Sequence, residues 1–301
     1  FNGRDFLPLS PTEFHQMTGR AGRRGMDHIG FAVTVPGRFM DIRRIAKLVS
    51  LPPSDVVSQI KINFSMVLNL LLSHTPDQIE DLLKKSFATF LMVTARKKRG
   101  ARKSFKDEQK QLWRDFLHHL NFLKDTGYVT EQGILTDDGK WASQLRVDQP
   151  IMMAQGFRLG GFPESDPALL AAIIALFVNE RESNDSIEKM FKPKTLMTSF
   201  RKVKTSLEPF AEQMTDRGFD VRPLFLRPAA TLYAWANGQS WEKVLSVAKM
   251  EEGDLAMLIL RTADNLRHVR TLTRVFPEAA KTSARSIELI MRSPVVMDYD
   301  I

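Results

Sequence analysis

Arginine and glycine residues cluster close to the start of the chain. Gly19, Gly22 and Gly25 recur at every third position, and residues without a side chain let a backbone approach a partner closely. Arg20 and Arg23 are also three residues apart, which predicts that both lie on one face of a helix. Two guanidinium groups can pair bidentately with phosphate oxygens and stay charged at physiological pH. The pattern favours phosphate binding and phosphoryl transfer. A basic loop that pairs with surface carboxylates is the alternative.

A second candidate site is a polar stripe on the helix predicted over residues 254–274. Apolar residues at positions 255, 258, 259, 266 and 269 follow the helical period and predict a buried face. They leave Arg261, Asp264, Asn265 and His268 along a polar stripe. Arginine can bind phosphate or stack on a base, and aspartate can accept from a base edge or orient the arginine. A solvated face, with Arg261 paired to Asp264 or Asn265, is the alternative.

A basic segment separates two helical regions. Residues 96–106 contain seven Lys or Arg side chains and no acidic one. Arg96, Lys97, Lys98 and Arg99 follow one another directly. Self-repulsion predicts an open segment, which either binds backbone phosphates or serves as a solvated tether.

Composition narrows the classes of function. The chain has 301 residues and a formal net charge of +8, which favours polyanionic partners. The absence of Cys excludes disulfides and thiolate metal sites and fits a reducing compartment. No apolar run is long enough to span a bilayer, so we expect a cytoplasmic protein that does not bind a membrane. No metal site is expected either. The first residue is Phe1 rather than Met, which suggests a fragment.

Three segments must position these candidate residues. Residues 1–40 predict a helix over 13–21, a basic loop and a strand over 31–35 that needs neighbouring strands. Residues 41–145 predict a helix that starts at Ser54 or Asp55, another over 76–91 with Phe87 and Phe90 on its apolar face, a third near 112–127 and a hairpin over 128–135. This order favours a winged helix. Residues 146–301 predict a helical bundle, with helices over 152–159, 167–182, 196–217, 224–236, 240–248, 254–274 and 277–291.

Taken together, the motifs resemble the superkiller-type branch of superfamily 2 RNA helicases. The string Gln16 to Asp27 is similar to motif VI of that superfamily, in the form Q-M-x-G-R-A-G-R-x-G. Other elements resemble the branch in the same order along the chain. They are Leu51-Pro52-Pro53 through Leu71, Lys85-Ser86-Phe87, Gly127-Tyr128 through Ala142, Tyr233 through Gly238, and Glu252 through Leu255.

The resemblance implies a mainly α-helical fold with three parts. These are the end of a second RecA-like α/β domain at 1–40, a winged helix at 41–145 and a helical ratchet domain at 146–301. Arg20 and Arg23 would be arginine fingers that reach the γ-phosphate of ATP. Gln16, Gly19 and Arg24 would lie in the same nucleotide site.

The resemblance also implies a role for the polar stripe and the basic segment. Arg261 and Asp264 match the nucleic-acid contacts of the family's ratchet helix, and Asn265 and His268 extend that stripe. Exosome-linked relatives insert an arch domain where this chain has only the basic segment, so an archless member is expected. Arg96, Lys97, Lys98 and Arg99 are the candidate phosphate contacts there.

These expectations predict the C-terminal part of an ATP-dependent RNA helicase. The chain contains no G-x-x-x-x-G-K-[ST] loop and no D-E-x-H box. ATP and Mg²⁺ are therefore expected in the full-length enzyme, while the fragment alone binds neither and is inactive. We expect RNA as the preferred partner and DNA as the second. A ribonuclease or another RNA-decay protein is a candidate protein partner, and the chain is expected to be a monomer. Two alternatives stay open: a non-enzymatic RNA-binding or scaffold module, and a DNA-unwinding repair helicase.

Overall fold

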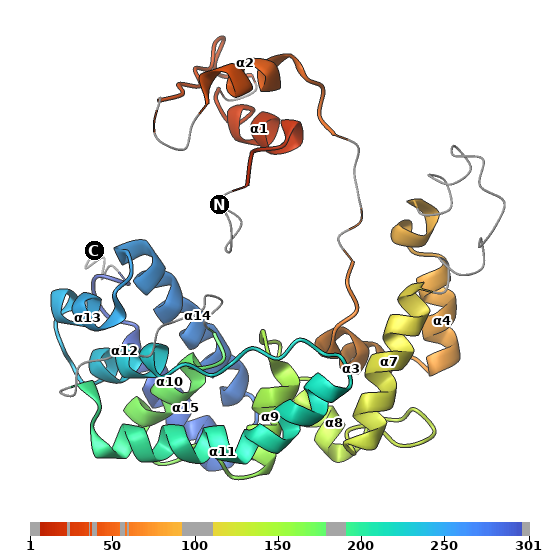
Figure 1. Cartoon of the computed structure of the whole chain (residues 1–301), viewed down its shortest axis with the longest axis vertical. Helices are drawn as coiled ribbons and strands as arrows, with labels where there is room; N and C mark the ends of the chain where they lie inside the picture. The colour runs from red at the N-terminus through yellow and green to blue at the C-terminus, as the bar shows by residue number, and fades with distance from the viewer. Residues whose placement is uncertain are drawn as a thin grey trace. The chain divides into compact units, whose positions relative to one another are not determined.

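The computed structural model describes residues 7–22, 25–35, 37, 41–54, 58, 60–91, 111–178 and 191–296. This part of the chain is mainly α-helical, as the sequence predicts (Figure 1). Internal contacts divide the chain into two units, residues 1–59 and residues 60–301.

The first unit is built on α1 (Pro11–Thr18) and α2 (Ile42–Ser50). The Ser10 side chain caps α1 and forms a reciprocal capping box with Glu13. The α1 helix is tied to the chain after α2, because Ser54 N donates to Thr12 Oγ1 at 2.7 Å and His15 Nε2 lies 2.7 Å from Leu51 O. No prediction from sequence covered α2.

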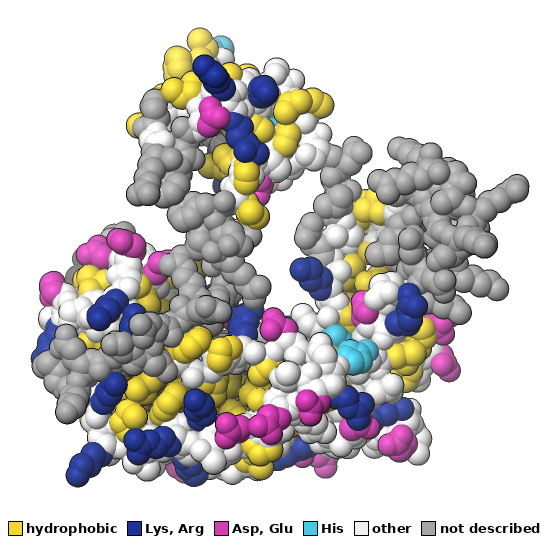
Figure 2. Space-filling model, viewed as in Figure 1, with side chains coloured by type: hydrophobic (Ala, Val, Ile, Leu, Met, Phe, Trp, Pro, Cys, Tyr) yellow, Lys and Arg dark blue, Asp and Glu magenta, His cyan; other side chains and the backbone are white. Residues whose placement is uncertain are grey.

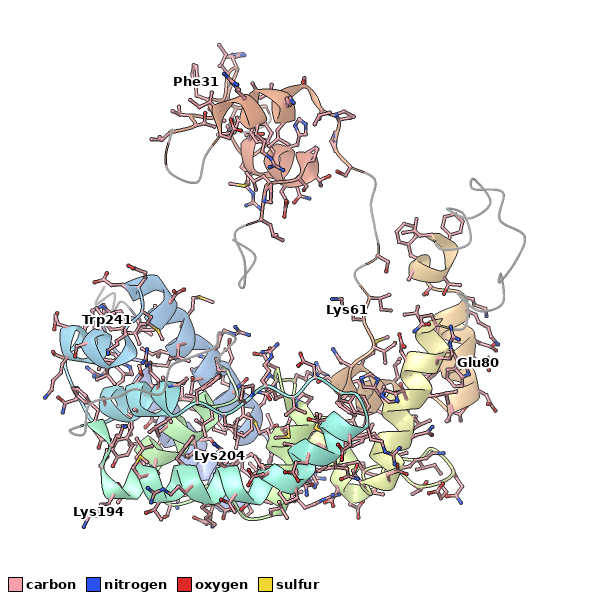
Figure 3. The ribbon with its side chains drawn as sticks, viewed as in Figure 1. Phe31, Lys61, Glu80, Lys194, Lys204 and Trp241 are labelled. Carbon is pink, nitrogen blue, oxygen red and sulfur yellow. The ribbon has the colours of Figure 1, made fainter. Side chains whose placement is uncertain are left out.

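Two predictions for the first unit are corrected. The helix expected over 13–21 ends at Thr18, where Gly19 follows as the C-cap. Phe31, Val33 and Val35 form no strand, and Phe31 and Val33 are 82% and 83% exposed (Figure 3). An isolated segment cannot form a ladder, since its backbone groups find no neighbouring strand among the described residues.

The second unit begins with α3 (Phe64–Leu71), α4 (Pro76–Lys84), α7 (Gln111–Asp125) and α8 (Asp137–Ala142). The helix expected from Ser54 or Asp55 starts only at Phe64, because Asn63 caps it through Met66 N at 2.9 Å. The predicted hairpin is reduced to an antiparallel bridge between Val129 and Leu135.

The helix predicted over 76–91 is interrupted. The α4 helix ends at Lys84, and the Ser86 side chain then caps a further helical turn over residues 87–91 by accepting from Thr89 N at 3.3 Å. Phe87 and Phe90 were expected on a buried face, yet they are 48% and 59% exposed and stack on each other. The break after Lys84 turns them away from the face that buries Leu83.

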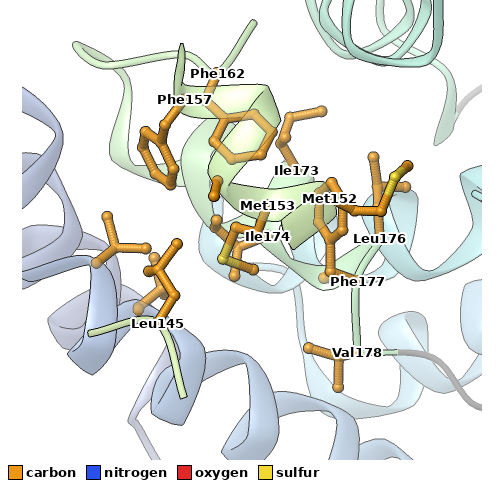
Figure 4. Close-up of a cluster of buried hydrophobic side chains, with 14 of the residues drawn as sticks. Leu145, Met152, Met153, Phe157, Phe162, Ile173, Ile174, Leu176, Phe177 and Val178 are labelled. Carbon is orange, nitrogen blue, oxygen red and sulfur yellow. The ribbon is translucent and has the colours of Figure 1, made fainter. Parts of the chain in front are cut away.

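The remaining helices confirm the predicted bundle. They are α9 (Pro150–Arg158), α10 (Pro167–Ala175), α11 (Lys194–Asp216), α12 (Leu226–Ala236), α13 (Trp241–Ala248), α14 (Glu252–Arg270) and α15 (Pro277–Ile290). The α10 helix is buried all round and packs against α12, α14 and α15. A helix that is apolar on every side must lie at the centre of a fold. Figure 4 shows the core around the end of α10, where Ile173, Ile174 and Phe177 are fully buried with Met153.

Trp235 on α12 joins the bundle to its C-terminal end. Its indole is fully buried and donates through Nε1 to Ile290 O at 2.7 Å. The Arg292 guanidinium lies 3.3 Å from the ring centroid and donates to Trp235 O and Gln239 O. A single aromatic side chain therefore connects α12 with the end of α15.

We expect Trp235→Phe to lower the free energy of unfolding by about 1–3 kcal/mol, because the Ile290 carbonyl is left buried without its donor. Urea denaturation followed by circular dichroism measures this loss. The matched control is Trp241→Phe, at a half-buried ring on α13 that packs edge-on against Trp235. A loss in the control as large as in Trp235→Phe would contradict the role of the hydrogen bond.

His119 on α7 is held in an aromatic cluster. Its ring packs against Phe64 and Phe219, with centroid distances of 4.7 Å and 4.9 Å. Nδ1 lies 2.7 Å from Asp115 O, so this nitrogen carries the proton of the neutral ring and donates it. Burial lowers the pKa of His119, and the neighbouring His118 lowers it further.

The free energy of unfolding should fall as the pH drops below about 6.5, the ordinary pKa of histidine. His119 binds a proton less readily in the folded protein, so the unfolded chain takes up the proton first and gains stability. Urea titrations at about pH 7.5 and about pH 5.5 should show a smaller decrease for His119→Gln than for the unchanged chain. The neighbouring His118→Gln is the control, and an identical decrease in all three proteins would refute the assignment.

Candidate nucleic-acid interface

The α14 helix buries one face and exposes a narrow charged edge. Its predicted apolar face is confirmed, since all five residues lie in the core: Leu255, Leu258, Ile259, Leu266 and Val269. Contacts with α10, α13 and α15 fix the rotation of the helix about its axis. This packing therefore fixes the direction in which each charged side chain leaves the helix backbone.

Arg261 forms an ion pair across two elements. Its Nη2 lies 2.5 Å from Oδ2 of Asp148, which belongs to the segment just before α9. The two side chains are 32% and 35% exposed. This ion pair joins α14 to another element, whereas the sequence suggested a pair within the helix. A charge-assisted contact of this kind is also how guanidinium binds phosphate.

Asp264 and Asn265 occupy different environments. Asp264 is exposed and pairs with Arg267, one helical turn further along α14. Asn265 is 7% exposed, and its amide nitrogen has no hydrogen-bond partner among the described residues. Asn265 is thus a buried group beside the stripe, and the exposed stripe is narrower than the sequence pattern indicates.

His268 lies two helical turns beyond Arg261 and is half-buried. Its ring lies close to the backbone of Gln144. Burial lowers the pKa of His268, and the positive charge of Arg146 lowers it further. The ring is therefore neutral at pH 7, and the fixed positive charges at this edge come from arginines.

The residues from Gln144 to Asp148 were missed by reasoning from sequence. They connect α8 to α9 and bring Arg146 and Asp148 next to α14. A short irregular segment has no hydrophobic period, so the sequence pattern did not indicate that this segment lies next to α14. Asp148 also lines a cavity of about 250 Å³, together with Phe64, His119 and Phe219.

Charge alone does not single out this edge. Figure 2 shows Lys and Arg side chains interspersed with Asp and Glu side chains over the visible face of the second unit. The edge is distinguished by its position on α14 and by its partners in the segment before α9.

The candidate nucleotide site in the first unit is only partly described. Gln16, Gly19 and Arg20 are exposed, and no described carboxylate forms an ion pair with Arg20. Arg20 lies after the C-cap of α1, so the helix that was expected to carry it ends before it, and Gly22 has a left-handed φ of 83°. Arg23 and Arg24 lie outside the described residues, as do the basic residues Arg96, Lys97, Lys98 and Arg99.

The described ranges contain no group of three or more His, Asp or Glu side chains placed to hold a metal ion. None of their helices combines the length and the hydropathy needed to cross a bilayer.

Known proteins resemble this chain over limited regions. Superkiller complex protein 2 of Mus musculus is 30% identical over 152 residues, which is 50% of this chain and 11% of that protein. Probable helicase HelY of Mycobacterium tuberculosis (strain ATCC 25618 / H37Rv) is 38% identical over 90 residues, 30% of this chain and 10% of that protein. DExH-box ATP-dependent RNA helicase DExH15 chloroplastic of Arabidopsis thaliana is 24% identical over 194 residues, 61% of this chain and 16% of that protein. The chain thus spans only a small share of each relative.

The family model described as DSHCT (NUC185) domain matches residues 132–298. This match includes α14 and its charged edge together with the segment before α9. The match covers more than half of the sequence, and the chain therefore belongs to the DSHCT (NUC185) domain family, the C-terminal region of superkiller-type helicases.

Proposed function

We propose that this chain is the C-terminal part of an ATP-dependent RNA helicase, which couples ATP hydrolysis to movement along nucleic acid and to its unwinding. The DSHCT match over residues 132–298 is the observation that carries the proposal. One relative has the printed name of an ATP-dependent RNA helicase, which supports the reaction and the substrate class. Two others are named as a superkiller complex protein and as a helicase.

The proposed domain order is the end of a second RecA-like domain at 1–40, a winged helix at 41–145 and a ratchet bundle at 146–301. The exposed apolar side chains of Phe31, Val33 and Val35 support the first assignment, because a strand of a larger sheet would bury them. The bridge between Val129 and Leu135 and the α8 helix after it support a small wing.

In this proposal the chain contributes positive charge at three places. Arg20 and Arg23 act as arginine fingers on the γ-phosphate of ATP, with Gln16, Gly19 and Arg24 around them, and ATP and Mg²⁺ are held by other parts of the full-length enzyme. Arg261 binds the single strand, flanked by Asp264, Asn265 and His268. Arg96, Lys97, Lys98 and Arg99 add nonspecific phosphate contacts.

We further propose cytoplasmic RNA processing as the setting, with RNA preferred over DNA. The name of the mouse relative includes a superkiller complex, which supports a search for protein partners such as a ribonuclease. The isolated fragment is proposed to be monomeric and without ATPase activity.

Arg261→Ala should weaken the binding of a labelled oligouridylate to the 301-residue chain by about tenfold, because one guanidinium contact to a phosphate or base is lost. Fluorescence anisotropy measures the dissociation constant. The matched control is Arg201→Ala, which removes an exposed arginine from α11. Equal affinities of the two variants would remove Arg261 from the proposed site.

Arg20→Ala or Arg23→Ala, introduced separately into the full-length protein, should abolish RNA-stimulated ATP turnover and leave strand binding intact. A finger that stabilises transferred phosphoryl charge contributes on the order of a thousandfold or more in rate. Phosphate release and anisotropy, measured on the same preparations, separate the two effects. Normal turnover in both variants would refute the arginine-finger assignment.

A further inference from the structure

The segment from Gln144 to Asp148 runs beside α14 in the opposite direction. Asp148 meets Arg261 at 2.5 Å, while the side chain of Gln144 accepts from Thr271 Oγ1 at 3.5 Å. The contacts therefore extend from Arg261 to the C-cap Thr271, ten residues further along the helix axis, which is about 15 Å at 1.5 Å per residue. The segment and the charged edge of α14 form two parallel sides of one surface.

This segment is held firmly to the protein core. Leu145 is 1% exposed and lies among the buried side chains of the bundle (Figure 4). Residues on either side of a buried anchor keep a fixed position, so Gln144 and Arg146 stay next to α14 with little freedom. Pro150 then starts α9 and fixes the other end of the segment.

Arg146 is the exposed cation of this segment. No carboxylate of the described residues forms an ion pair with it, whereas its charge acts on His268. Arg261 lies two helical turns from His268, about 10 Å along the axis. A polyanion that follows the edge of α14 would therefore meet Arg261 and Arg146 in succession.

Asp148 already occupies the guanidinium of Arg261. Carboxylate and phosphate bind guanidinium through the same planar, charge-assisted contacts, so they compete for one position. About one-third of each side chain is exposed, so solvent and a solute can reach the pair. An incoming phosphate can therefore displace Asp148 without disturbing the core.

We infer that the segment 144–148 is the second half of the strand-binding surface, in which Arg146 binds a backbone phosphate and Asp148 holds Arg261 until a phosphate replaces it. The inference rests on the proposed function and adds two residues to it. The ligand class is a single-stranded nucleic acid, because Arg261 and Arg146 offer successive cations along one edge, which suits an extended polyanion. Asp148 lowers the affinity for the strand, since a bound phosphate must first replace the carboxylate on Arg261.

The test uses the 301-residue chain and a fluorescein-labelled oligouridylate at several salt concentrations. We expect Arg146→Ala to weaken binding about threefold to tenfold and to reduce the slope of log K against log salt by about one, the loss of one phosphate contact. Asp148→Asn should strengthen binding, because the amide has no charge to compete with phosphate. This gain should vanish when Arg261→Ala is combined with Asp148→Asn. Arg201→Ala is the control, and thermal melting of each variant verifies folding.

The outcomes separate this inference from the proposal on which it rests. If Arg261→Ala weakens binding while Arg146→Ala leaves affinity and salt slope unchanged, the inference fails and the proposed function stands. If neither variant has an effect, the strand site itself lies elsewhere and both fail. Weaker binding by Asp148→Asn would show that Asp148 supports Arg261 rather than competing for it. Polyglutamate that binds as tightly as the oligonucleotide, with the same dependence on Arg146, would point to an acidic protein partner instead.

Discussion

The burial of α10 is the constraint on which the rest of the bundle depends. This helix presents only apolar side chains, so it is stable only when other helices cover it on every side. The α12, α14 and α15 helices provide that cover. Because α14 must turn its leucine, isoleucine and valine side chains inward, its charged residues are left at one edge. The position of Arg261 on α14 therefore follows from the burial of a different helix, α10.

The edge of α14 gains its chemical character from an irregular segment. Asp148 and Arg146 come from the connection between α8 and α9, and Leu145 between them is anchored in the core. Asp148 therefore offers a carboxylate to Arg261, and the guanidinium of Arg146 is exposed in the same segment. Stability and proposed function share this connection, since the buried anchor that completes the core also holds the two charged neighbours in place.

The first unit illustrates the opposite case, in which local rules are satisfied but burial is incomplete. Its α1 helix has a full capping box and three tertiary hydrogen bonds to the chain after α2. Phe31, Val33 and Val35 nevertheless remain exposed. Alternating apolar residues form a strand only when a neighbouring strand satisfies the backbone, so their pattern indicates a preference that these residues alone cannot fulfil.

Sequence by itself determined the helical bundle, the buried face of α14 and the resemblance to superkiller-type helicases. Hydrophobic periodicity and short motifs depend only on residues that are close together in the chain. The sequence misplaced the start of α3 and the burial of Phe87 and Phe90, where the Asn63 and Ser86 caps override periodicity. It also missed α2. Only the tertiary structure decided that Arg261 pairs with Asp148 and that Asn265 is buried. Arg261 and Asp148 are more than a hundred positions apart, and such a pair forms only after the helices between them have packed.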